Sequence, residues 1–118
     1  SKGFCYRMMY RIKLTPNAVE QIGSVVGYIS NELHSPETAL RWSDLLKSEI
    51  AKLSEMPARF RLFDTDPWRS LGIHVLPVKN FIVYFWINEE EQTVWITAVV
   101  YQRRDQLKVL MEMPLDMI

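Results

Sequence analysis

The sequence has few of the residues from which the commonest catalytic and metal sites are built. Its one cysteine, Cys5, cannot form a disulfide within the chain, and this fits the reducing cytoplasm. Its two histidines, His34 and His74, have no further histidine or cysteine at metal-ligand spacing. Its four glycines stand singly, which excludes a glycine-rich phosphate loop, and no serine has the flanking glycines of a nucleophile elbow. We therefore expect no metal ion and no cofactor.

Long apolar runs and an excess of charge of one sign are also absent. No run approaches the roughly 18 apolar residues of a membrane span, so we expect no membrane partner. The formal net charge is +0, because 14 basic residues balance 14 acidic ones. Proteins that bind nucleic acid on their own are usually visibly basic, so the overall charge argues against such a protein unless basic residues gather locally.

The length of 118 residues suits one domain, since domains commonly have about 100–150 residues. We expect a single domain over residues 9–118. Residues 1–8 are expected to be a tag or a disordered tail, because Met8 or Met9 would be a natural start.

Two kinds of apolar spacing alternate along the chain and predict its secondary structure. Three- and four-residue spacing after a threonine-proline or serine-proline start predicts helices over residues 16–33 and 36–53. Alternating or continuous apolar residues predict strands over residues 10–15, 69–76, 81–87 and 93–101. Residues 58–68 are expected to form a loop, residues 77–80 and 88–92 to form turns, and residues 102–113 suit a short last helix.

The spacing of these elements predicts the fold class. Two helices joined so closely must fold back as a hairpin, and neither is stable without another surface to cover. The short links between the last three strands imply an antiparallel meander. We therefore expect an α+β fold, β-α-α-β-β-β, in which a helical hairpin packs on a small, four-stranded, mainly antiparallel sheet. The apolar stripe of the hairpin is expected to stay partly exposed.

Several basic residues are predicted to lie at strand ends and in the adjoining loops. They are Arg59 and Arg61 in the loop, Arg69 at the start of a strand, Lys79 in a turn, and Arg103 and Arg104 after the last strand. Strand ends bring distant residues together, so a cluster of these arginines would grip phosphates or stabilise a phosphorane-like transition state. The alternative is that they are solvated charges, some of them paired with nearby aspartates. The sequence leaves both interpretations open.

Aromatic residues are plentiful in the second half of the chain. In a protein of this size most of them are expected to be core, although stacking on bases is the alternative. Tyr101 is the exception, because it ends the last predicted strand beside Arg103 and Arg104. Its hydroxyl is a candidate acid, base or hydrogen-bonding group toward a partner.

Five segments resemble, in their order and spacing, the RelE/ParE toxin superfamily. They are Ser35–Ala39 (SPETA), Leu53–Pro57 (LSEMP), Pro67–Ser70 (PWRS), Pro77–Tyr84 (PVKNFIVY) and Val100–Asp105 (VYQRRD). Each segment is short, but together they are specific, and the resemblance extends over residues 10–110. It implies a cytoplasmic toxin of a type II toxin–antitoxin system that is neutralised by a cognate antitoxin.

The resemblance implies one of two activities. RelE-like members cleave messenger RNA on the ribosome through the 2′-hydroxyl, whereas ParE-like members inhibit DNA gyrase and are not nucleases. The candidate catalytic residues of a nuclease are Arg69, Arg103 and Tyr101, and the candidates for binding the target or the antitoxin are Arg61, Lys79 and Arg104. The antitoxin is expected to cover the basic strand ends by charge pairing and by steric exclusion.

Two departures from the nuclease pattern favour the ParE branch. The central-strand arginine of RelE-like nucleases falls here at Phe81 or Ile82, and the tyrosine of their C-terminal helix falls near Val109. DNA gyrase is therefore the expected target. A RelE-like endoribonuclease that uses Tyr101 is the alternative, and a decayed member that only binds its antitoxin is a third hypothesis.

Overall fold

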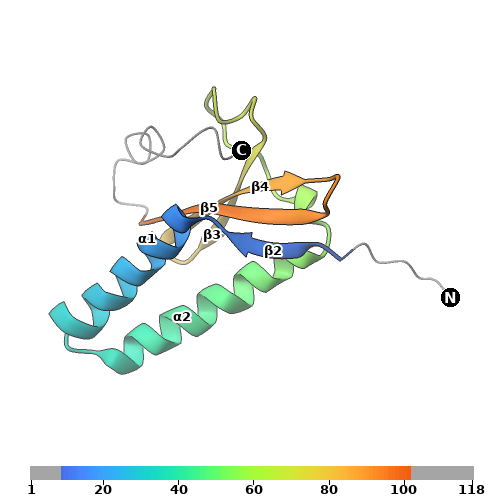
Figure 1. The fold of residues 1–118 in the computed structure, drawn as a ribbon. Helices are drawn as coiled ribbons and strands as arrows, with labels where there is room; N and C mark the ends of the chain where they lie inside the picture. The colour runs from blue at the N-terminus through green and yellow to red at the C-terminus, as the bar shows by residue number, and fades with distance from the viewer. Residues whose placement is uncertain (1–8, 102–118) are drawn as a thin grey trace, which may run out of the picture.

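The computed structural model describes residues 9–101, and Figure 1 shows their fold. In chain order the elements are strand β2 (Arg11–Leu14), helix α1 (Pro16–Gly27), a π-helical turn (Tyr28–Glu32), helix α2 (Pro36–Ala51), two 3-10 turns (Lys52–Ser54 and Pro57–Arg59), and strands β3 (Ile73–Val78), β4 (Phe81–Asn88) and β5 (Thr93–Tyr101). The predicted order β-α-α-β-β-β is confirmed. The tail at 1–8 and the helix at 102–113 lie outside the described residues.

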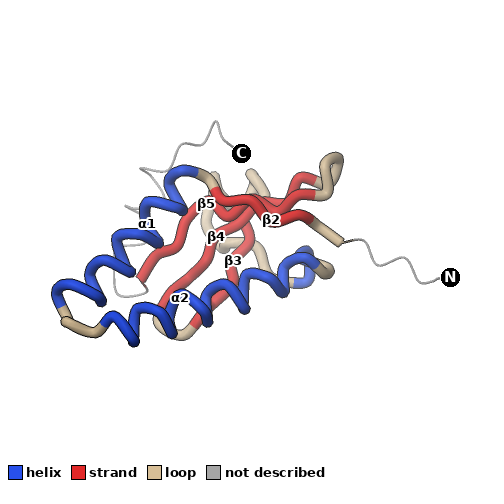
Figure 2. The backbone as a smooth tube through the Cα atoms, turned by 60° about the horizontal axis from the view of Figure 1, so that its bottom comes forward, coloured by secondary structure: helices blue, strands red, loops and turns tan. Residues whose placement is uncertain are grey.

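The four strands form one mixed sheet in the order β2-β5-β4-β3. Strands β3, β4 and β5 run antiparallel, and β2 lies parallel to β5 at the edge of the sheet. Figures 1 and 2 show α1 and α2 on the same side of this sheet, joined at one end and diverging toward the other. The predicted α+β class and the mainly antiparallel sheet are therefore confirmed. Within residues 9–101 no helix is long and apolar enough to cross a membrane.

Apolar side chains are buried on both faces of the sheet. On the helix side, Ala18 of α1 and Leu46 of α2 pack with Phe85 and other strand residues. On the opposite side, Phe63 and Trp68 from the segment before β3 cover the sheet together with residues of β3, β4 and β5. Burial on two faces explains why β4 is a continuous apolar run instead of an alternating one.

A β-bulge divides β5 into two halves with different neighbours. Tyr84 of β4 is opposite Ala98 and Phe85 is opposite Ile96, so Thr97 is an additional residue on β5. The Thr97 hydroxyl donates to the carbonyl oxygen of Tyr84 at 3.1 Å. Before the bulge β5 pairs with β2, whereas after it the start of α1 lies along β5.

Polar side chains of α1 satisfy the edge of β5 beyond the bulge. The Thr15 hydroxyl and the Asn17 amide donate to the Thr97 carbonyl oxygen at 3.3 and 3.0 Å. The Gln21 amide oxygen accepts from the Val99 N–H at 2.7 Å. Thr15 also accepts from the Ala18 N–H at 3.2 Å, which confirms the predicted N-cap of α1. Helix α1 thus replaces a neighbouring strand over this half of β5.

Some predicted boundaries differ from the structure. The strand expected from Arg69 begins at Ile73, because Asp66 Oδ1 accepts from the Ser70 N–H at 3.0 Å and from its hydroxyl at 2.6 Å and so holds a turn. Pro77 belongs to β3 and not to the turn that was expected there. At the start of α2, Ser35 makes no side-chain cap.

The first helix is also shorter than predicted. Its α-helical part ends at Gly27, and residues Tyr28–Glu32 continue it as a π-helical turn. The second predicted helix, to residue 53, ends as an α-helix at Ala51 and tightens into a 3-10 turn. Both changes lie at helix ends, where hydrogen-bonding patterns commonly change.

Candidate functional site

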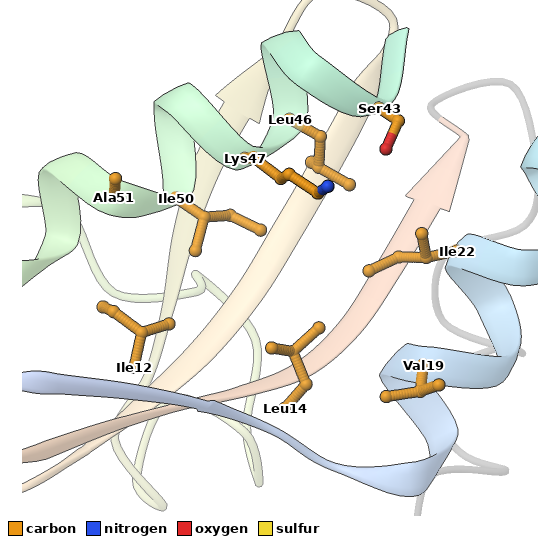
Figure 3. Close-up of a pocket in the computed structure, with 9 residues that line it drawn as sticks. All are labelled: Ile12, Leu14, Val19, Ile22, Ser43, Leu46, Lys47, Ile50 and Ala51. Atoms are coloured by element: carbon orange, nitrogen blue, oxygen red, sulfur yellow. The ribbon is translucent and has the colours of Figure 1, made fainter. Parts of the chain in front are cut away.

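An apolar groove separates the two helices where they diverge, and we call it the hairpin groove. It has a volume of about 420 Å³ and is lined by Ile12, Leu14, Val19, Ile22, Ser43, Leu46, Lys47, Ile50 and Ala51. Figure 3 shows Ile12 and Leu14 of β2 pointing toward α2, with Val19 and Ile22 of α1 on the other side. Lys47 is the one charged residue of this lining. The groove therefore offers mainly apolar contact with a cation at its rim.

Local structure explains why the groove stays open. Thr15 and Pro16 start α1 directly after β2, and the bonds to Thr97 and Val99 hold α1 over β5. Helix α2 ends instead beside the start of β2, where the Tyr10 N–H donates to the Ser54 carbonyl oxygen at 2.8 Å. The start of α1 is thus held over β5, whereas the turn after α2 is held beside the segment that leads into β2, and the groove lies between the two helices.

Two side chains of the groove region are exposed although they are large and apolar. Leu14 is 37 % exposed and Val19 is 56 % exposed. The expectation that the stripe of the hairpin stays partly exposed is therefore confirmed. Exposed apolar side chains that gather beside a groove are characteristic of surfaces that bind other proteins.

A second pocket, of about 260 Å³, lies on the face of the sheet opposite the helices. Its lining residues are Arg61, Phe63, Asp64, Thr65, Val75, Ile82 and Tyr84. Burial raises the pKa of Tyr84 to about 12, while the positive charge of Arg61 acts in the opposite direction and Asp64 raises it further. The Tyr84 hydroxyl is therefore neutral at physiological pH. Because Asp64 lines the pocket together with Arg61, a carboxylate opposes the binding of a phosphate there.

Two of the predicted catalytic residues lie at opposite ends of the sheet. Arg69 lies in the exposed turn before Ile73, at the start of β3, whereas Tyr101 ends β5 opposite Phe81. Residues Ile73 and Val78 of β3 span this distance, which is about 16 Å at roughly 3.3 Å per residue. Arg103, the third predicted catalytic residue, lies outside the described residues.

Tyr101 is packed among aromatic side chains on the helix side of the sheet. Its ring centroid is 5.3 Å from that of Phe81, and Phe81 is 5.0 Å from Trp42 of α2. Arg69, in contrast, belongs to the segment whose Phe63 and Trp68 cover the other face. The structure therefore does not bring Arg69 and Tyr101 together.

The predicted binding residues are also spread over the molecule. Arg61 borders the pocket on the far face, and Lys79 is exposed in the turn between β3 and β4, at the same end of the sheet as Tyr101. Arg104 lies outside the described residues. Sequence reasoning did not single out Lys47 or Leu14 as site residues. Their signal was weak, since one is an ordinary exposed lysine and the other an ordinary strand residue.

The sequence and the fold were compared with known proteins. The family model described as "ParE toxin of type II toxin-antitoxin system, parDE" matches residues 12–106. None of the curated proteins compared with the chain matches it significantly.

Solved structures of toxins share the fold. A chain of the chromosomal ParDE toxin–antitoxin system from P. aeruginosa has a TM-score of 0.65 at 16 % identity, covering 80 % of this chain and 97 % of that one. The toxin–antitoxin complex RelBE2 from Mycobacterium tuberculosis gives 0.59 at 15 % identity, with 82 % and 95 % covered. A mutant of the E. coli toxin RelE in the free state gives 0.55 at 11 % identity, with 86 % and 93 % covered. The chain belongs to the ParE toxin family and is the toxin component of a type II toxin–antitoxin system.

Proposed function

We propose that this toxin stops growth by binding DNA gyrase in the cytoplasm, without cutting RNA. The observation that carries the proposal is the separation of Arg69 from Tyr101 by the length of β3. Groups that act on one phosphate must lie within hydrogen-bond reach of it, a few ångströms at most. Two residues at opposite ends of a rigid sheet do not meet that condition.

The surroundings of Tyr101 and of the central strand support the same function. The Tyr101 ring packs on Phe81, and Phe81 packs on Trp42, and this packing supports a structural role for the tyrosine at the end of the sheet. Ile82, one of two positions where the nuclease pattern has an arginine, is buried and apolar. A buried isoleucine offers nothing to a developing negative charge.

The cognate antitoxin is the second partner, and we assign it to the hairpin groove. An apolar groove with Leu14 and Val19 exposed beside it suits the apolar side chains of a protein segment. Covering this groove would bury surface that the free toxin leaves in water. Charge pairing with Arg61 or Lys79 would add orientation more than affinity.

The target is tested with purified toxin in a gyrase supercoiling assay. Supercoiling should be inhibited at the toxin concentrations that stop growth, and addition of the antitoxin should restore it. In cells, thymidine incorporation should fall within minutes of induction and before methionine incorporation does. An unchanged supercoiling rate at growth-stopping concentrations would overturn the proposal.

The nuclease alternative is tested with the double substitution Arg69→Ala and Tyr101→Phe. Both changes leave the core intact, since Arg69 is exposed and the phenylalanine keeps the aromatic contact with Phe81. If the toxin acts by binding gyrase at another surface, the variant should remain toxic. Loss of toxicity together with loss of messenger RNA cleavage at the ribosome would establish the nuclease instead.

A further inference from the structure

Two tryptophans lie side by side on the far face of the sheet, which is the face opposite the helices. Val94 and Ile96 of β5 belong to the core on the helix side, so Trp95 between them points to the far face. The strand register places Trp95 opposite Trp86 of β4 and beside Lys13 of β2. Lys13, Trp95 and Trp86 thus form one row across three neighbouring strands, which we call the tryptophan row.

The row lies at the border of the covered part of the far face. Phe63 and Trp68 belong to the cluster that covers this face, and Trp86 packs against that cluster while Trp95 is in contact with neither core. Along β5 only Trp95 and Tyr101 are not fully buried. A tryptophan that stays partly in water on an otherwise buried strand is typical of a residue that binds a partner, because tryptophan is enriched among the residues that dominate protein interfaces.

Two cations accompany the row on the same face. Arg11 and Lys13 alternate with the groove residues Ile12 and Leu14, so their side chains lie on the far face. Both cations are exposed, and neither forms a salt bridge with any residue between 9 and 101. Lys13 Nζ lies 5.5 Å from the centroid of the Trp95 ring, whose π electrons attract the positive charge. The row therefore presents an aromatic surface beside positive charge that no described carboxylate pairs with.

The surroundings of the row favour a protein as its partner over a nucleic acid. The turn between β4 and β5 carries three acids, Glu89, Glu90 and Glu91. The next residue, Gln92, accepts at its carbonyl oxygen from the Arg11 N–H at 2.9 Å, so these acids lie near one end of the row. They would repel the phosphates of a nucleic acid, which binding proteins usually grip with several cations. Tryptophan and arginine within a surface of mixed charge are instead typical of a protein interface.

We propose that the tryptophan row is the surface by which the toxin binds its target protein, with Trp95 in an apolar pocket of the target and acidic side chains of the target facing Arg11 and Lys13. Tryptophans at the centre of an interface contribute much of the affinity, and the charges around them steer the encounter. The inference rests on the proposed binding of DNA gyrase and names the part of the toxin that makes the contact. The hairpin groove lies on the helix side of the sheet, so the target and the antitoxin meet different faces.

Substitution of Trp95 tests the inference in two assays. Trp95→Ala should raise the toxin concentration that half-inhibits gyrase supercoiling by at least about tenfold, and induced cells should continue to grow where the wild type arrests them. The affinity for the cognate antitoxin, measured by calorimetry, should stay unchanged, and this readout also verifies that the variant is folded. Tyr28→Ala is the matched control, because Tyr28 is 56 % exposed on the hairpin outside the groove lining and should change neither assay.

Charge reversal is the second test and leaves both tryptophans in place. Lys13→Glu should weaken the inhibition of gyrase by at least about fivefold, and the loss should shrink as salt is added. Arg41→Glu is the control, since Arg41 is exposed on α2 on the other side of the sheet and its variant should inhibit like the wild type. Equal inhibition and equal toxicity of Trp95→Ala, Lys13→Glu and the wild type would overturn the inference and leave the proposed function intact.

Other results separate the inference from the proposed function. If the wild type arrests growth without inhibiting gyrase, and both variants lose toxicity while they keep their antitoxin affinity, the gyrase proposal fails and the inference stands for another target protein. If both variants lose antitoxin affinity as well, the row is not specific to the target and the inference is wrong.

Two further occupants of the row are examined with the toxin alone. If the toxin binds a DNA or RNA oligonucleotide and both variants lose that binding, the partner is a nucleic acid and the inference is overturned. If the toxin self-associates in sedimentation experiments and both variants remain monomeric, a second copy of the chain occupies the row, and the inference is overturned as well.

Discussion

The two edges of the sheet are treated in opposite ways. Along β3, the Phe63 N–H donates to the Ile73 carbonyl oxygen at 2.7 Å, and the Val75 N–H donates to the Arg61 carbonyl oxygen at 3.0 Å. The next outward-facing residue is Pro77, which has no N–H to leave unpaired. Along β2, no comparable segment covers Ile12 and Leu14 within residues 9–101.

The difference shows which edge of the sheet is covered against pairing with another chain and which edge is available for it. Unpaired strand edges invite pairing with other chains, and proteins usually cover them or interrupt them with proline. The β3 edge has both protections, whereas no residue between 9 and 101 pairs with the outward backbone groups of the β2 edge beside the apolar groove. We therefore expect the β3 edge to contribute stability and the β2 edge to contribute binding.

The largest effect is expected from removing an apolar side chain of the segment that covers the β3 edge and the far face. Phe63 is 8 % exposed and contacts Trp68 and Tyr84 edge to face, so Phe63→Ala should cost about 3–5 kcal/mol in the free energy of unfolding. Urea denaturation measures the loss. Leu71→Ala, in the same segment but 37 % exposed, is the matched control and should cost much less. Similar losses for the two variants would show that this segment does not secure the β3 edge.

A smaller loss is expected where β2 passes into α1. Thr15→Val keeps the shape of the side chain but removes the cap of Ala18 and the bond to Thr97, at a cost of about 1–2 kcal/mol. Thermal unfolding followed by circular dichroism measures it. Ser24→Ala, exposed on the same helix, should leave the midpoint almost unchanged. A stable Thr15→Val variant would mean that Asn17 and Gln21 alone fix α1 to β5.

The far face of the sheet gives a pH-dependent test. Burial raises the pKa of Tyr84 to about 12 from 10.0, so the folded state favours the neutral hydroxyl. This stabilisation is complete below pH 10 and is lost as the pH rises through about 12. Between these values the unfolding free energy of the wild type should fall more steeply than that of Tyr84→Phe. Parallel curves up to pH 12 would show that the hydroxyl ionises as freely in the folded chain as in the unfolded one.

The smallest effect on stability is expected at the open edge. Leu14 is 37 % exposed, so Leu14→Ala should cost less than about 1 kcal/mol in the free toxin. The same change should weaken antitoxin binding by about tenfold, because it removes an apolar contact in the groove. Isothermal titration calorimetry provides the affinity, and Leu40→Ala, 63 % exposed outside the groove lining, is the control. A large loss of stability without a loss of affinity would reverse the roles assigned to the two edges.

The sequence predicted the elements better than their arrangement. The strand expected over residues 93–101 agrees with β5 at both ends, because a mainly apolar run between polar segments is typical of a buried strand. The expectation for Arg69 failed because the Asp66–Ser70 bonds that hold its turn depend on side-chain geometry, not on periodicity.

The site was harder to predict than the fold. The gathering of arginines at strand ends assumed that Arg69 and Tyr101 share one end of the sheet, and the strand directions place them at opposite ends. The hairpin groove lies between α1, which is held over β5, and α2, whose following turn is held beside the segment before β2, and both attachments are contacts between residues far apart in the chain. The spacing of apolar residues along the sequence does not predict such contacts.

The bulge at Thr97 determines more than the curvature of β5. Side chains alternate between the two faces of a strand, and the bulge takes up the additional residue, so Val94 and Ile96 face the helices before it and Val99 faces them after it. Deleting Thr97 would place Ala98 directly after Ile96, opposite Tyr84 and Phe85, so the ladder would become regular and Tyr101 would stay beside Phe81. The deletion would instead remove the Thr97 carbonyl oxygen, which accepts from Thr15 and Asn17, so the additional residue serves to anchor the start of α1 on β5.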